Sequence, residues 1–248
     1  MLNVLWRNMK WRFKNPVTIV MTILQPMIWL ILYSTVAEQT MKGVDGGNYT
    51  AFIFPGIIVL VTFSSSGSSG IVNYIMKTRG SFYRIQISPI KRSSIVLGHF
   101  LEAIILSFFE VTVLCVLSLF FSVRVASGAN GLLLMYILIF LIAFFISGIS
   151  YSLSLKLPNE DIFQTVMNTI VLPIFFVSTA LFPLENITGG FRIAVLINPF
   201  THIINNLRKL IFESSIDFNR FFYTLGIFII LCFFSYALAL RCLEKDRK

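Results

Sequence analysis

Six apolar runs, each long enough to cross a lipid bilayer as a helix, limit what this chain can fold into. The runs occupy residues 17–36, 52–75, 95–121, 132–155, 162–181 and 221–240. A helix of about 20 apolar residues covers the hydrocarbon core of a bilayer. Because backbone polar groups inside lipid need partners within the protein, we expect all six runs to be helices. The sequence therefore predicts an all-α membrane protein, with residues 1–248 forming one transmembrane domain of six helices.

The amino-acid composition supports this class. Hydrophobic residues make up 56% of the 248 positions and charged residues 12%, whereas about a quarter of a typical soluble domain is charged. The net charge of +9 comes from Lys and Arg that lie between the apolar runs, which indicates contact with anionic lipid rather than nucleic acid. Cys115, Cys232 and Cys242 fall inside or at the end of apolar runs, without metal-ligand spacing. We expect neither a disulfide framework nor a metal site.

The positive charges predict the orientation of the chain in the membrane. The longest basic segment, Met76–Arg92, carries five Lys or Arg and no acidic residue. Because basic loops translocate poorly, this segment is expected in the cytoplasm. If the N-terminus, the turn at 156–161 and the tail after residue 240 lie on the same side, 14 of the 20 basic residues are inside. Both termini are then cytoplasmic. A segment that only sets topology would carry the same charge, so charge alone does not establish a binding role.

Two segments outside the six runs are amphipathic. In residues 1–16, five apolar side chains share one helical face and four basic ones lie elsewhere around the wheel. This pattern predicts an interfacial helix that ends before Pro16; a positively charged flank of the first transmembrane helix is the alternative. In residues 203–211, five apolar side chains fall within an arc of about 120°. They predict a second amphipathic helix, on the outer face of the membrane.

Small and polar residues interrupt the second and fifth runs. In the second run, Ser66 and Gly70 have the small-xxx-small spacing of closely packed helices. The same run would equally suit a helix that lines a polar path. The fifth run contains Asn168 and Pro173, and a Pro within a membrane span is tolerated where neighbours satisfy the freed carbonyl. This helix is expected to face protein or a cavity rather than lipid.

The third run carries His99, Glu102 and Glu110 on one helical face. Carboxyl groups at membrane depth usually face protein or water. The stripe is either a catalytic or proton-relay set, or two groups near the cytoplasmic interface with Glu110 alone deeply placed. The second interpretation is favoured because no other run supplies an acidic or histidine partner. The sequence has no P-loop, Gly-x-Ser-x-Gly or His-Glu-x-x-His motif, so no catalytic residue is predicted.

Several short motifs occur in the order found in a known family. They are Arg79-Gly80-Ser81, Ser88-Pro89 and Gly98 after the second run, and Phe182-Pro183-Leu184-Glu185 and Asn198-Pro199-Phe200 before the sixth. Together with the six runs and the amphipathic start, they resemble the ABC-2 type permeases, the membrane subunits of ABC exporters, over nearly the whole chain. The resemblance implies a type V exporter-like fold. That fold adds a cytoplasmic coupling helix and short extracellular re-entrant and amphipathic helices to the six spans.

The resemblance further implies a transport subunit of the plasma membrane that is not itself an enzyme. Two permease copies, identical or different, would work with two separate ATPase subunits. ATP and Mg would bind to those partners, and this chain would bind no cofactor. The residues implied to couple to the ATPase are Lys77, Arg79, Gly80, Ser81, Phe82, Arg84, Ser88 and Pro89. Relatives often carry acidic residues in this stretch, whereas it is basic here.

The substrate path at the dimer axis is implied to lie along the second and fifth runs. Its residues would be Ser66, Gly70, Phe163, Asn168, Phe175 and Phe176. The expected function is export of an amphiphilic, lipid-like, glycan or drug-like substrate by alternating access. Two other functions stay open: an ion-coupled secondary transporter or channel with Glu110 as the titrating group, and a membrane enzyme that uses His99 and Glu102.

Overall fold

The computed structural model describes residues 49–245, with gaps at 79, 81, 83–89, 120–122, 124, 187 and 214–216, together with scattered residues between 5 and 35. All the regular secondary structure of this described part is helical. The predicted interfacial helix at 1–16 and the predicted first transmembrane helix at 17–36 lie largely outside the described residues. Those two assignments stay predictions.

Among the residues that the structure describes, four helices are long and apolar enough to cross a membrane. They are α3 (Tyr49–Thr78), α5 (Arg92–Ser118), α6 (Gly128–Lys156) and α10 (Phe218–Lys245). They coincide with the second, third, fourth and sixth apolar runs of the sequence. Lys77, Lys156 and Lys245 occupy the last turns of α3, α6 and α10. A cation is favourable there because the carbonyl end of a helix is the negative end of its dipole.

The fifth run forms a shorter helix, α7 (Glu160–Phe176), of 17 residues. It ends five residues before the predicted boundary at 181, and the chain turns away after it. The last carbonyl groups of a helix have no partner within the helix and are costly to bury. Here they accept hydrogen bonds from side chains: the Ser178 hydroxyl donates to the carbonyl of Phe175, and the Asn198 amide donates to that of Ile174. These bonds allow α7 to stop inside the protein.

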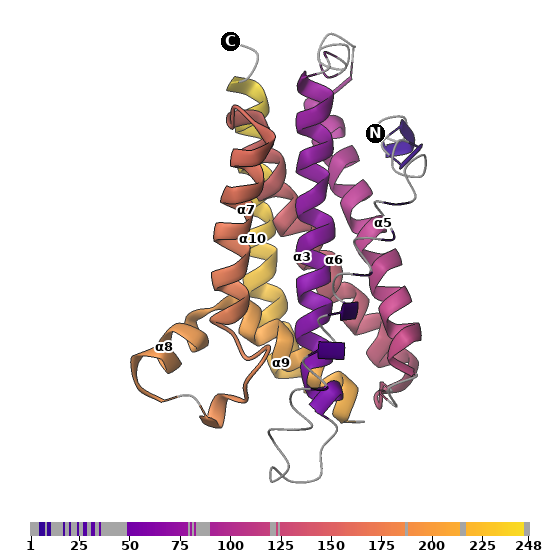
Figure 1. Ribbon diagram of the computed structural model, residues 1–248, viewed down its shortest axis with the longest axis vertical. Helices are drawn as coiled ribbons and strands as arrows, with labels where there is room; N and C mark the ends of the chain where they lie inside the picture. Colours follow the sequence, from indigo (N-terminus) through magenta and orange to yellow (C-terminus); the bar gives the residue numbers. More distant parts are fainter. Residues whose placement is uncertain are drawn as a thin grey trace.

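Helix α3 lies at the centre of the bundle, in contact with α5, α6, α7 and α9 (Figure 1). Small residues allow the close approach of neighbouring segments. A Cβ atom added at Gly56 would lie 2.8 Å from the Cβ of Ala180, and one added at Gly148 of α6 would lie 2.6 Å from the Oγ of Ser235 on α10. Close packing of this kind is a main source of helix association in lipid, where apolar surface gains nothing by leaving water.

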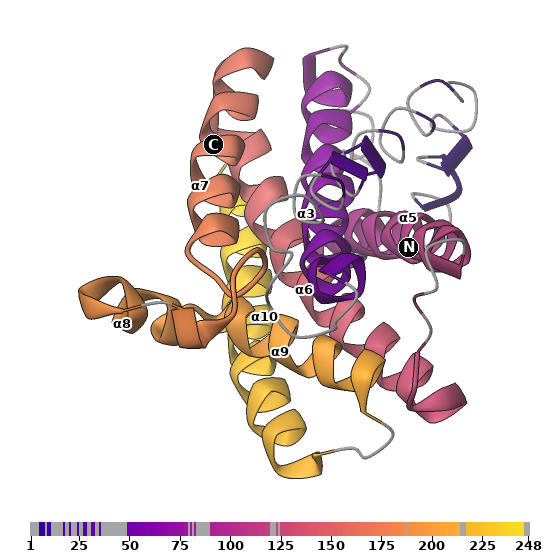
Figure 2. The ribbon, with the colours of Figure 1, turned by 60° about the horizontal axis from the view of Figure 1, so that its bottom comes forward.

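Short helices cover the end of the bundle opposite the C-terminus. After the 3-10 turn η2 (Leu184–Asn186) come α8 (Gly189–Ile197) and α9 (Pro199–Phe212). Figure 2 shows α9 lying across the ends of the long helices. The apolar residues of the arc predicted at 203–211 are all buried; they are Ile203, Ile204, Leu207, Leu210 and Ile211. Their burial attaches α9 to the bundle.

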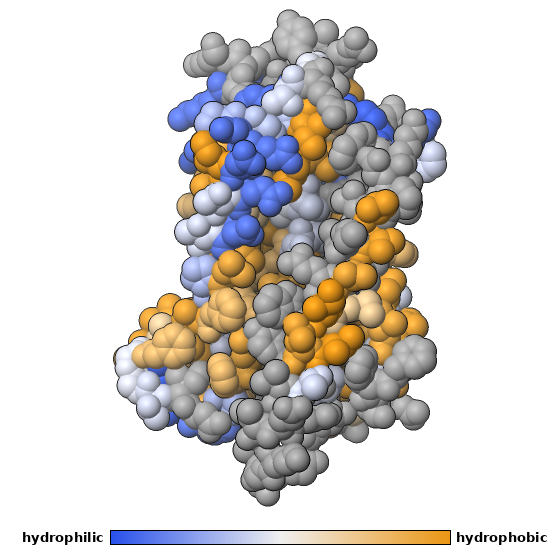
Figure 3. All heavy atoms as spheres, viewed as in Figure 1, coloured by the Kyte–Doolittle hydropathy of each residue, from blue (hydrophilic) through white to orange (hydrophobic). Residues whose placement is uncertain are grey.

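The two ends of the bundle differ in surface character. On the face drawn in Figure 3, hydrophilic residues gather at the end where α3 finishes and the C-terminus lies, and hydrophobic residues cover much of the lower part. The hydrophilic end also holds the end of α3 and the start of α5, the described limits of the basic segment that the sequence predicts to be cytoplasmic.

Candidate functional site

The basic segment between α3 and α5 is the first part of the candidate site. Lys77, Gly80 and Phe82 are the predicted coupling residues within the described part of the chain. The other predicted coupling residues lie outside it; these are Arg79, Ser81, Arg84, Ser88 and Pro89. Gly80 has φ = 71°, and its N–H donates to the carbonyl of Lys77 at 3.1 Å. A residue with a Cβ is strained in this left-handed conformation, so the glycine permits the tight turn that ends α3.

Phe82 is buried inside the bundle rather than presented at its surface. Only 3% of its surface is exposed. It belongs to a cluster of buried residues contributed by the ends of three helices: Ile95, Val96 and Phe100 of α5, Tyr151 and Leu155 of α6, and Ala239, Cys242 and Leu243 of α10. We call this set the Phe82 cluster. The basic segment is thus attached to α5, α6 and α10 by a buried aromatic ring.

Three hydrogen bonds join the end of α3 to the end of α6 and the turn that follows it. The Asn73 amide donates to the Ser154 hydroxyl, the Tyr74 hydroxyl to the carbonyl of Pro158, and the Lys77 ammonium to the carbonyl of Leu155, each at 2.7 Å. The Lys77 bond is charge-assisted and so among the stronger kinds. Since Lys77 also precedes the turn at Gly80, a displacement of the basic segment would move α3 and α6 together.

The acidic residues of the third run are buried, and one of them lies near a basic residue from the start of the chain. His99, Glu102 and Glu110 are each at most 1% exposed. Burial lowers the pKa of the Arg7 guanidinium, and the charge of Glu102 partly offsets this effect. Arg7 also donates to the Sδ of Met76 at 2.9 Å. Sequence reasoning missed this proximity because it considered only acidic and histidine partners, and only within the other apolar runs.

Three of the predicted path residues are buried in helix contacts. Ser66 of α3 lies 3.2 Å, Oγ to Oγ, from Ser107 of α5. A Cβ atom on Gly70 would lie 2.7 Å from the ring of Phe163 on α7 and 2.8 Å from the carbonyl oxygen of Ser150 on α6. Of the two interpretations of the Ser/Gly run, these contacts correspond to close helix packing. Assignment of these residues to a path stays a prediction.

The remaining path residues lie on α7. Asn168 and Phe176 are exposed, whereas Phe175 is 4% exposed and packs inward. Four other exposed residues of α7 share the outward face: Gln164, Thr165, Thr169 and Leu172. We call this set, with Asn168 and Phe176, the α7 outer face. It was not predicted as a whole, although positions three and four residues from Asn168 are the ones that share its side of a helix. The area of α7 in Figure 3 changes from hydrophilic above to hydrophobic below.

Asn198 connects the end of α7 to the start of α9. Its amide donates to the carbonyls of Ile174 at 2.7 Å and Val177 at 2.5 Å, and its carbonyl oxygen accepts from the Phe200 N–H at 3.0 Å. Pro199 follows at the first helical position, where the absence of an N–H costs nothing. The Asn-Pro-Phe motif is therefore a cap for two helices.

Arg208 of α9 links three segments and was also missed. Its guanidinium donates to the carbonyl of Phe52 at 3.3 Å and that of Thr179 at 2.6 Å, and it lies 3.8 Å from the centre of the Phe52 ring. It also donates to the side chain of Asn205. The planar, multiply donating guanidinium suits this arrangement, which a lysine cannot reproduce.

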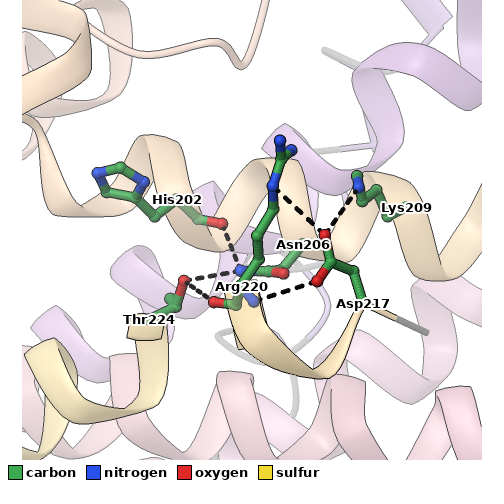
Figure 4. A network of polar contacts seen from close by, with 6 residues as sticks. All are labelled: His202, Asn206, Lys209, Asp217, Arg220 and Thr224. Carbon is green, nitrogen blue, oxygen red and sulfur yellow. Dashed lines mark hydrogen bonds and ion pairs between the residues drawn. The ribbon is translucent and has the colours of Figure 1, made fainter. Parts of the chain in front are cut away.

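A further polar network joins α9 to the start of α10 (Figure 4). The Asn206 amide donates to the Thr224 hydroxyl at 2.7 Å. Asp217 accepts from the Arg220 N–H at 3.3 Å and pairs with the Lys209 ammonium at 3.4 Å and with the Arg220 guanidinium at 3.3 Å. The hydrogen bond from the Arg220 backbone and the charge of Lys209 hold the pKa of Asp217 below its ordinary value. The network fixes α9 against the start of α10.

No group of three His, Cys, Asp or Glu side chains suited to a metal ion occurs within the part of the chain that the structure describes.

Known proteins share this sequence pattern. The chain matches the ABC-2 type transporter family over residues 1–212. It is 29% identical over 220 residues to "Putative transport permease ycf38" of Cyanophora paradoxa. The matched region is 88% of this chain and 76% of that protein. It is 26% identical over 181 residues to "ABC transporter G family member 20" of Dictyostelium discoideum. The matched region is 71% of this chain and 24% of that protein. With this match and its long apolar helices, the chain is a membrane protein that belongs to the ABC-2 type transporter family and acts as a transport permease.

Proposed function

We propose that this chain is the membrane-spanning subunit of an ATP-driven exporter that moves an amphiphilic, lipid-like, glycan or drug-like substrate out of the cytoplasm. Two copies pair in the plasma membrane and associate with two ATPase subunits, which bind ATP and Mg. The first apolar run and α7 complete six spans, and both termini are cytoplasmic. The family match and the relative named as a member of the ABC transporter G family support this proposal, as does the concentration of basic residues in the segments between runs.

The observation that carries the proposal is the burial of Phe82 in the Phe82 cluster. A docking segment transmits force only if it is rigidly attached to the helices that must move. Phe82 belongs to one buried cluster with residues at the ends of α5, α6 and α10, and Lys77 bonds the adjacent end of α3 to α6. When ATP draws the two ATPases together, the segment moves with them and shifts these helix ends as a unit. The bundle then passes from an inward-open to an outward-open arrangement.

The α7 outer face is the part of the bundle best suited to meet a substrate or the second copy. It exposes polar groups such as Gln164 and Asn168 toward one end of α7, and apolar ones such as Leu172 and Phe176 toward the other. Polar side chains at membrane depth face protein or water rather than lipid. A face with both characters fits an amphiphilic cargo at the dimer axis.

Two substitutions separate docking on the ATPase from attachment to the bundle. Arg84→Glu reverses a charge in the basic segment, so it should abolish co-purification of the ATPase while the permease stays folded. Phe82→Leu shortens the buried ring, so the ATPase should still bind but its hydrolysis rate should no longer respond to the permease in liposomes. Phe222→Leu is the matched control, because Phe222 is 63% exposed, and it should behave as the wild type. Normal co-purification and normal stimulation in both test variants would contradict the proposal.

Orientation needs its own test. A single cysteine at position 84, in a chain whose three native cysteines are replaced, should react with a membrane-impermeant maleimide only in inside-out vesicles. Labelling from intact cells would place the basic segment outside and exclude coupling to a cytoplasmic ATPase.

One observation favours a second function. Glu110 is fully buried in a helix that is long enough to span the membrane, as the titrating group of an ion-coupled transporter would be. In that case Glu110→Gln abolishes transport driven by a proton gradient in vesicles that contain no ATP. A variant that keeps ATP-dependent activity excludes this function.

A further inference from the structure

A basic pocket lies at the hydrophilic end of the bundle, beside the end of the basic segment, whose last residue, Arg92, lines it. Its volume is about 740 Å³, and it is lined by the start of α5 and the ends of α6 and α10. Pockets of a few hundred to about 1,000 Å³ are of the size that holds a small molecule or part of one. The charged residues that line it are Arg92, Lys156, Arg241, Glu244 and Lys245.

The charges in this pocket favour an anionic ligand. Arg92 pairs with Glu244 at 3.1 Å, so these two charges largely cancel. Within the described part of the chain, Lys156, Arg241 and Lys245 have no ion-pair partner. Three like charges in one pocket repel one another, and a phosphate group would relieve that repulsion. The pocket is therefore a site of unbalanced positive charge rather than an internal salt-bridge network.

An exposed apolar stripe leads from the pocket along α10. Leu238 lines the pocket and is 38% exposed, and Phe234 and Ile230, one and two turns away, are 72% and 69% exposed. Residues four apart lie on the same face of a helix, so the three form a continuous strip. Helix α10 is long and apolar enough to cross the membrane, which places this strip against lipid chains. Positive charge above an apolar strip matches the two parts of a phospholipid.

We propose that this pocket binds the headgroup phosphate of an anionic phospholipid, with an acyl chain along Leu238, Phe234 and Ile230. Basic pockets at the cytoplasmic ends of transmembrane helices recognise anionic headgroups in this way. The bound lipid contacts the ends of α5, α6 and α10, the same helices that hold the Phe82 cluster. The lipid site is separate from the transported substrate, so it can exist whether or not the proposed exporter function is correct.

Lipid binding is measured by native mass spectrometry of the purified full chain titrated with phosphatidylglycerol or with phosphatidylcholine of the same acyl chains. Phosphatidylglycerol should bind at least tenfold more tightly. The variant Lys156→Gln/Arg241→Gln should bind it about 25-fold more weakly, from roughly fivefold per lost charge, with phosphatidylcholine unchanged. The control variant Arg192→Gln, which removes one exposed cation from α8, should keep wild-type affinity.

Other results would overturn the proposal. Equal binding of the two lipids, or an equal loss of affinity in the double variant and in the Arg192→Gln control, excludes a specific site. If millimolar inorganic phosphate displaces bound phosphatidylglycerol as effectively as added phosphatidylglycerol does, the pocket is a free-phosphate site instead. If the Lys156→Gln/Arg241→Gln variant no longer co-purifies with the ATPase but keeps its lipid affinity, the pocket is a protein-docking surface. If the double variant does not fold, photoactivatable phosphatidylglycerol is cross-linked to the wild-type chain; its adducts should map to residues 238–245, and adducts confined to other segments refute the site.

Discussion

Asn198 offers a sharp test of how the end of the bundle that carries α8 and α9 is held together. Removing its side chain by Asn198→Ala leaves the carbonyls of Ile174 and Val177 and the N–H of Phe200 without their present donor or acceptor, at a position only 9% exposed. Loss of an N-cap costs about 1 kcal/mol, and each buried unsatisfied group costs about 1–3 kcal/mol. The expected decrease in the free energy of unfolding is at least about 3 kcal/mol, from one lost cap and two carbonyls without a donor.

The informative variant is Asn198→Asp. If Asn198 acted only as the N-cap of α9, this change would be nearly neutral, because Asp caps helices as well as Asn does. In the structure, however, the Asn198 amide donates two hydrogen bonds to the end of α7. A carboxylate cannot donate them and would face two carbonyl oxygens. We therefore expect Asn198→Asp to decrease the free energy of unfolding by about 2 kcal/mol, from about 1 kcal/mol for each of the two part-buried carbonyls that loses its donor.

The assay is thermal unfolding of the purified chain in detergent, followed by size-exclusion chromatography of heated samples. A loss of about 2 kcal/mol corresponds to a decrease of roughly 4–8 °C in Tm for a chain of this size. Asn219→Asp is the matched control, because Asn219 is exposed in the first turn of α10, where a negative charge is favourable. An Asn198→Asp protein as stable as the wild type would refute the two-helix cap.

Three further variants test other contacts by the same measurement. Gly70→Ala should destabilise the fold by about 1–3 kcal/mol through overpacking, because the added Cβ meets Ser150 and Phe163; Gly226→Ala, with open space around it, should not. Arg208→Lys should cost about 1–3 kcal/mol, since an ammonium cannot replace the guanidinium's charge-assisted bonds to two carbonyls. Asp217→Asn should lower Tm at neutral pH. Since the pKa of Asp217 is lowered in the folded state, its stabilisation is present above its ordinary pKa of 3.8 and is lost as the pH falls through the lowered value.

The last three experiments have distinct contrary outcomes. Equal Tm values for the alanine variants at 70 and 226 would mean that the bundle relaxes around the added methyl group. Full stability of the lysine variant at 208 would show that charge alone suffices. A difference in Tm between wild type and the asparagine variant at 217 that does not shrink in acid would mean that the carboxylate is not the stabilising species.

The long helices were predictable because their signal is local. An apolar run of sufficient length predicts a helix whatever surrounds it, and α3, α5, α6 and α10 coincide with four of the runs. The end of α7 was not predictable in this way. Its carbonyls are bonded by Asn198, which lies 21 and 24 residues further along the chain. Only the fold brings that side chain to the end of the helix.

The candidate site likewise combines features that the sequence predicts locally with features that only the tertiary structure creates. The shared helical face of His99, Glu102 and Glu110 follows from their spacing, and all three residues are buried. The proximity of Arg7 to Glu102 does not follow, since it depends on where the start of the chain folds back. Phe82 lies in a basic segment, so its surroundings in the sequence suggest a surface position. Its burial arises from the apolar ends of three helices that meet only in the tertiary structure.

The buried ring of Phe82 also constrains how such transporters can be re-engineered. A chimera that receives the α3–α5 connection of a relative exchanges a piece of the hydrophobic core along with the exposed charges. Unless the donor supplies an aromatic side chain of similar volume at position 82, the graft leaves a void among the ends of α5, α6 and α10. Such a hybrid would fail through poor folding, and its failure would be misread as incompatibility with the new ATPase.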